Sequence, residues 1–160
     1  MIYNKSEKAI MKFLKDNNGG MLINEFKQVI AMARSRQEAR NKILHLADTI
    51  VKHLTLLILF RKNNVEVPTV WIKELKSYFV DIESTWFTNE QVLDIINEIF
   101  VDAKKKILII LEEYPVLIYK KIKVKVDEIF EKKQNLKDLG VDFKNDIVHI
   151  DGIPIWKNLE

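Results

Sequence analysis

Apolar residues between positions 43 and 58 recur at steps of three and four residues, and this spacing constrains the fold more than any other feature. The members of this row are Ile43, Leu46, Ala47, Ile50, Leu54, Leu57 and Ile58. An α-helix turns once in about 3.6 residues, so the row forms one apolar stripe along a helix. Other elements must cover such a stripe, which predicts a helical bundle.

Two shorter helices are predicted before this row. They are expected over about residues 6–15 and 23–33, with the breaker residues Asp16–Gly20 between them. Their expected buried faces are Ile10, Phe13 and Leu14 in the first, and Phe26, Val29, Ile30 and Ala33 in the second. Ser35 and Glu38 form a capping-box pattern, which predicts that the central helix starts as a separate element at Ser35.

Three more helices are predicted after residue 64. Their expected bounds are about Val70–Asp81, Thr88–Glu113 and Val116–Lys133. Thr88 and Gln91 form a second capping box at the start of the longest one. Pro115 ends that helix and suits the first turn of the next, and Gly140 closes the helical region.

The C-terminal residues follow a different pattern. Ile147–Ile150 and Ile153–Trp156 flank Asp151-Gly152, a pair that favours the tight turn of a β-hairpin. The predicted fold class is therefore all-α, a bundle of five or six helices over residues 5–139 with a short C-terminal β-hairpin over 146–157. A single domain is expected over residues 1–160.

Composition limits the cellular compartments and the partners that we expect for this protein. The sequence has no cysteine, which excludes disulfides and thiolate metal sites and is typical of a reducing compartment. The formal net charge of +3 is too small to indicate nucleic acid by itself. The longest apolar runs are far shorter than the roughly 20 residues of a membrane span, and the charged amino terminus does not resemble a signal peptide. We therefore expect a cytoplasmic protein without a membrane partner.

The sequence offers few ligands for a metal or cofactor. His45 and His53 are eight residues apart, so on one helix they lie roughly 12 Å apart, too far to share an ion. We interpret both as histidines at or near a helix surface. The Gly19-Gly20 pair precedes a helix but lacks the lysine and hydroxyl of a phosphate-binding loop. We expect no metal and no cofactor.

The segment Arg40-Asn41-Lys42-Ile43-Leu44-His45 resembles the signature of the HEPN ribonucleases. The resemblance implies that Arg40 and His45 form a catalytic pair across a dimer or pseudo-dimer, with Asn41 as a polar helper. It implies cleavage of RNA without a metal ion. The alternative interpretation of the same residues is an exposed helix face with mixed charges.

The first three predicted helices also have the spacing of a helix-turn-helix. Basic residues gather near the predicted start of the third helix, where a recognition helix contacts bases and phosphates. These residues are Arg34, Arg36, Arg40 and Lys42. DNA binding through this region is therefore a second hypothesis.

The segment Asn24–Lys42 resembles the start of an uncharacterised bacterial helical family, the domain of unknown function twenty-nine. In that family an apolar helix ends in a small residue followed by Arg-Ser. His53-Leu54 and Trp71 fall near its histidine-leucine and tryptophan landmarks. The resemblance implies a helical fold over about residues 7–130 and no defined activity.

Trp86 and Phe87 are adjacent aromatic residues in a predicted loop, where an unburied pair would indicate a partner surface. No set of nucleophile, base, metal ligands or phosphate cradle is visible in the sequence. We therefore expect a non-enzymatic binding or regulatory protein that acts through a protein interface, with an unknown partner or a second copy, or less strongly through DNA. The enzymatic alternative is the HEPN-like endoribonuclease.

Overall fold

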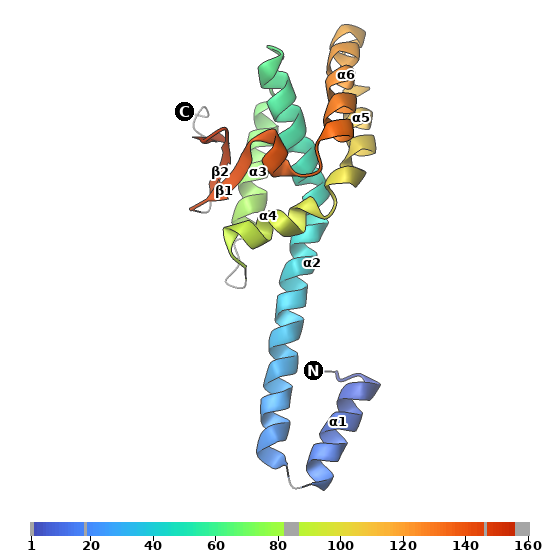
Figure 1. The fold of residues 1–160 in the computed structure, drawn as a ribbon, viewed down its shortest axis with the longest axis vertical. Helices are drawn as coiled ribbons and strands as arrows, with labels where there is room; N and C mark the ends of the chain where they lie inside the picture. The colour runs from blue at the N-terminus through green and yellow to red at the C-terminus, as the bar shows by residue number, and fades with distance from the viewer. Residues whose placement is uncertain (1, 18, 82–86, 146, 156–160) are drawn as a thin grey trace. The chain divides into compact units, whose positions relative to one another are not determined.

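The fold is all-α with a short C-terminal antiparallel sheet, as predicted (Figure 1). The computed structural model describes residues 2–17, 19–81, 87–145 and 147–155. The chain divides into two compact units, Met1–Glu38 and Ala39–Glu160. The single domain expected over residues 1–160 stays a prediction, because two compact units can still unfold together.

The first unit is a helical hairpin closed by Arg34. Helix α1 spans Lys5–Asp16 and packs beside the first part of α2, which spans Gly20–Lys62. The backbone N–H of Glu7 donates to the Asn4 side chain, and Glu7 accepts in return from the Asn4 backbone N–H, both at 2.8 Å. The Arg34 guanidinium donates to the same Glu7 carboxylate at 2.6 Å and lies 5.6 Å from the centre of the Tyr3 ring. These contacts hold the start of α1 against α2.

The predicted break between the second and third helices is wrong, because α2 is one continuous helix over Gly20–Lys62. Ser35 lies exposed in the middle of it. The Ser35–Glu38 pattern satisfies backbone N–H groups only at a helix end, and here they have partners within the helix. After Gly20 the sequence up to residue 62 contains no glycine or proline that would end a helix.

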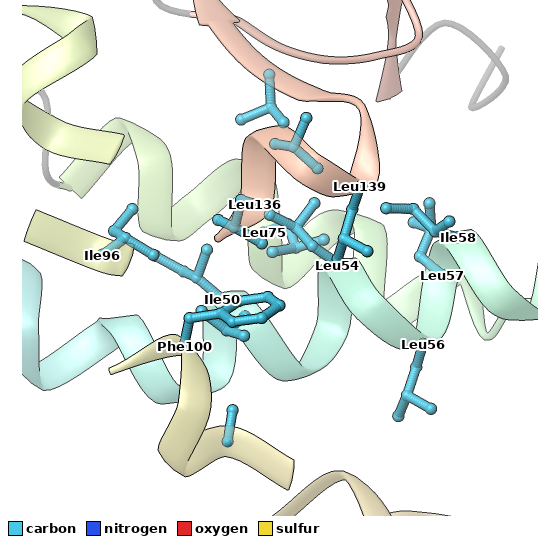
Figure 2. Packing of buried hydrophobic residues seen from close by; sticks show 14 of the residues in the cluster. Ile50, Leu54, Leu56, Leu57, Ile58, Leu75, Ile96, Phe100, Leu136 and Leu139 are labelled. Atoms are coloured by element: carbon cyan, nitrogen blue, oxygen red, sulfur yellow. The ribbon is translucent and has the colours of Figure 1, made fainter. Parts of the chain in front are cut away.

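The second unit is built around the C-terminal part of α2. Every residue from Val51 to Phe60 except Lys52 is buried, so this part of the helix is covered on all sides. Figure 2 shows that the side chains on one side of α2 meet residues from four other elements. These residues are Leu75, Ile96, Phe100, Leu136 and Leu139. Leu56 points to the opposite side of α2 and is also fully buried.

The elements that cover α2 follow the predicted order with one correction. Helix α3 spans Thr69–Asp81, and α6 spans Val116–Lys132 after Pro115, as expected. The capping box at Thr88 is present, but the predicted long helix is divided. Its three parts are α4 (Asn89–Asn97), the 3-10 helix η1 (Phe100–Ala103) and α5 (Lys104–Leu111).

The interruption of the predicted long helix lies at residues 98–103. Glu98, Ile99 and Asp102 donate to carbonyls three residues back, which winds the backbone more tightly than an α-helix. In Figure 1, α4 and α5 run in different directions on either side of η1. The bend therefore redirects the chain so that Ile96 and Ile107 are both fully buried.

The C-terminal sheet has one strand more than predicted. The 3-10 helix η2 (Leu136–Leu139) ends at Gly140, whose φ of 84° favours glycine. Strands β1 (Val141–Lys144), β2 (Ile147–Ile150) and β3 (Ile153–Pro154) follow in an antiparallel order β1-β2-β3. The hairpin at Asp151-Gly152 is confirmed, while β1 was not predicted because no Asp-Gly pair directly follows it in the sequence. Trp156 lies outside the described residues.

Among the described residues, one helical segment is long and apolar enough to cross a membrane, and it is Leu22–Lys62 within α2. Of its most apolar window, 67% is buried inside the protein. Burial of this kind is typical of a core helix, so the length and composition alone are weak support for a membrane span.

We predict that Ile50→Asp abolishes cooperative folding of the second unit. Ile50 is 0% exposed, and an unpaired carboxylate there costs several kcal/mol, a large part of the total stability of a domain. Thermal unfolding followed by circular dichroism measures the effect. The control is Val101→Asp, at a side chain that is 67% exposed, and it should unfold within a few degrees of the parent protein. An unchanged midpoint for Ile50→Asp would contradict the assigned core.

Candidate functional site

The HEPN-like residues do not converge within one chain. Arg40 and His45 both lie on α2, five residues apart, so their side chains leave the helix about 140° apart around its axis. Arg40 forms an ion pair with Glu98, which follows α4, and His45 is exposed. Asn41 is also exposed. A catalytic pair formed with a second chain would therefore first have to release Arg40 from Glu98.

The predicted DNA-binding residues lie in the middle of α2 rather than at the start of a recognition helix. Arg34 is engaged with Glu7, and Arg40 with Glu98. Arg36 and Lys42 are exposed. DNA binding stays a prediction, but the helix start that motivated it is absent.

The predicted aromatic partner surface is only half described. Trp86 lies outside the described residues. Phe87 is half-buried and packs against the hydrophobic core of the second unit. This contact accounts for much of its apolar surface.

A buried histidine, missed by the sequence interpretation, lies between α2 and α3. His53 is 5% exposed, and its ring stacks on Trp71 with centroids 5.4 Å apart and an angle of 13° between the planes. Its Nδ1 lies 3.5 Å from a carboxylate oxygen of Glu74 and has no hydrogen-bond partner among the described residues. The interpretation of His53 as a surface or boundary histidine is therefore wrong, because α3 covers it.

The surroundings of His53 oppose its protonation. Burial is the larger cause and the positive charge of Lys52 the smaller one, and together they lower the pKa of His53 from 6.5 to about 4. The ring is therefore neutral at pH 7, and the approach of Glu74 is not an ion pair at that pH. No group of three or more metal-ligating side chains lies together in the part of the chain that the structure describes.

We predict that His53 makes the folded state sensitive to acid. The pKa of His53 is about 4 in the folded state, below its unfolded value of 6.5. The free energy of unfolding is therefore undiminished above about pH 6.5 and decreases as the pH falls toward 4, because protons bind the unfolded state more readily. The loss amounts to about 3 kcal/mol. Urea unfolding of the parent and of His53→Phe, which does not titrate, measures the difference between pH 7.5 and pH 4. Equal loss of stability in both proteins would contradict the assignment.

The first unit presents an apolar surface that the sequence interpretation had placed inside the fold. None of the described residues of α1 is buried. Ile10, Phe13, Leu22 and Val29 are 45%, 64%, 53% and 61% exposed. Of the predicted buried faces, only Ile30 is buried, at 6% exposure, while Leu14 and Phe26 are half-buried. Two helices cannot bury the full apolar stripe of each other, because each covers only one side of its neighbour.

These four exposed side chains lie on one side of the hairpin, here called the apolar face. On α1, the half-buried Glu7 and Leu14 mark the side toward α2, and Ile10 and Phe13 lie to one side of them at 100° per residue. On α2, Ile30 and Arg34 mark the side toward α1, with Leu22 and Val29 beside them. In Figure 1, α1 and the first part of α2 run in opposite directions. At 100° per residue, both pairs therefore fall on the same side of the hairpin.

The net charge of the whole chain is carried by the first unit. Residues 1–38 contain seven basic and four acidic side chains, a net charge of +3. The remaining residues contain nineteen of each, a net charge of zero. Lys5 and Lys12 on α1 are exposed and lie about 80° and 100° beyond Phe13 around the helix, with the exposed Asp16 between them and Phe13.

No family model, no curated protein and no solved structure matches this chain. The resemblances to the domain of unknown function twenty-nine and to the HEPN signature therefore stay predictions from the sequence.

Proposed function

We propose that this chain is a non-enzymatic binding protein that docks through the apolar face of its N-terminal helical hairpin. One observation carries the proposal: Ile10, Phe13, Leu22 and Val29 are exposed together on one side of α1 and α2. Apolar surface gathered on one side of a helix pair is favourable to bury and commonly marks an interaction site. A protein partner or a second copy remains the expectation from sequence.

The second unit supports a scaffold role. Its apolar residues from α2 to β2 belong to one continuous core, in which the largest side chains are fully buried. The enzymatic alternative would need Arg40 and His45 to act together. Arg40 pairs with Glu98, and a catalytic pair formed across a dimer would first have to break this contact, which favours the binding interpretation.

We predict that a photo-reactive amino acid at position 13 forms cross-links in cells that produce the protein. Phe13 is 64% exposed on the apolar face and should contact the occupant directly. The matched control is position 117, where Leu117 is 84% exposed on α6. Mass spectrometry should identify a discrete product, protein or lipid, from position 13 only. Equal products from both positions, or none from either, would contradict the proposal.

We also predict that the purified protein does not cleave RNA in the absence of metal ions. The physical reason is that the guanidinium of Arg40 is held in an ion pair with Glu98. A mixed RNA pool incubated with the parent protein and with His45→Ala provides the test. Cleavage by the parent protein that disappears in His45→Ala would replace the binding proposal with the ribonuclease.

A further inference from the structure

We infer that the occupant of the apolar face is an anionic membrane surface, on which the hairpin lies flat. This inference rests on the proposed function and names the chemistry of its binding partner. Three properties of the first unit support it: the net charge, the small size of the exposed apolar face and the arrangement of lysines around α1.

Charge favours an anionic occupant over a second copy of the chain. Two hairpins joined through their apolar faces would gain nothing from their charge, because each carries a net charge of +3. The same +3 is attracted to a negatively charged lipid surface, where each basic side chain contributes favourably.

Size favours a lipid surface over a folded protein partner. The apolar face contains four exposed apolar side chains, whereas each partner of a typical stable complex contributes roughly 20 to 30 residues. A membrane surface does not require this minimum, because affinity there grows with apolar insertion and charge together.

The pattern around α1 fits a helix lying in a membrane interface. Such helices place lysines on the polar side and phenylalanine or leucine on the other. Lys5, Lys8, Lys12 and Lys15 occupy the exposed side of α1 away from Phe13 and Ile10. The side chains of Lys5 and Lys12 have long flexible stems, so their ammonium groups can reach lipid phosphates while Phe13 enters the acyl region.

A membrane surface as binding partner differs from the prediction, made from the sequence, that this protein has no membrane partner. That expectation followed from the absence of an uninterrupted apolar run long enough to span a bilayer. A helix that lies on the surface needs no such run, because only one face of it leaves water. Helix α1 covers only part of its apolar stripe against α2, so Ile10 and Phe13 stay exposed.

Vesicle flotation with the whole chain of 160 residues tests the inference. The probes are vesicles of phosphatidylcholine alone and vesicles containing about 30% phosphatidylglycerol, which carry a negative surface potential. We expect binding to the anionic vesicles, little binding to the neutral ones, and a marked loss of binding as salt is raised. Because the substituted side chains are exposed, every variant should keep the helical circular dichroism spectrum of the parent protein.

Two pairs of matched variants locate the binding surface. Lys5→Glu with Lys12→Glu should weaken binding to anionic vesicles at least tenfold, whereas Lys105→Glu with Lys132→Glu, which changes the net charge equally in the second unit, should weaken it about twofold or less. Phe13→Ser should weaken it about tenfold, and Leu117→Ser should leave it nearly unchanged.

The outcomes separate the occupant from the docking surface. Absence of binding to anionic vesicles, or binding that the hairpin and control variants weaken equally, overturns the inference. If vesicles fail but position 13 cross-links to a protein, an acidic protein partner replaces the membrane and the proposed function stands. If neither vesicles nor cross-links involve the hairpin, the proposed function fails as well.

Discussion

The burial of every residue of α2 from Val51 to Phe60 except Lys52 is the constraint on which the second unit depends. A helix that is apolar on every side can exist in water only if other elements surround it. Helices α3, α4, α5 and α6, together with η2 and the sheet, provide that cover. The bend at η1 and the turn at Gly140 follow from the same need, because each redirects the chain back toward the core.

Burial on all sides has a cost where the sequence of α2 carries a polar group. His53 is enclosed by Trp71 and kept neutral, and its Nδ1 lies close to Glu74 without forming a hydrogen bond. Thr55 is also fully buried, with a hydroxyl that has no partner among the described residues. Buried polar groups of this kind usually reduce stability, and the large apolar core around them offsets that loss.

The first unit, in contrast to the second, does not bury its apolar side chains completely. Two helices cannot enclose each other, so the hairpin is held by polar contacts at its open end, where Arg34 binds Glu7 and lies over Tyr3. Its remaining apolar side chains stay in contact with water. The protein therefore combines a unit that satisfies its apolar surface internally with a unit that does not. This contrast favours the hairpin, and not the second unit, as the binding surface.

Sequence periodicity determined the helical class, the stripe from Ile43 to Ile58, the capping box at Thr88 and the turn at Asp151-Gly152, because each depends on neighbours within a few residues. It could not show that α2 is continuous, since the capping pattern at Ser35 is chemically valid wherever a helix happens to start. Tertiary structure alone decided that Arg40 pairs with Glu98, that α3 covers His53, and that Phe13 and Val29 remain exposed. Those outcomes depend on which distant segment packs against each side of a helix. A spacing of three and four residues predicts which side of a helix is apolar, but it does not predict which segment will cover that side.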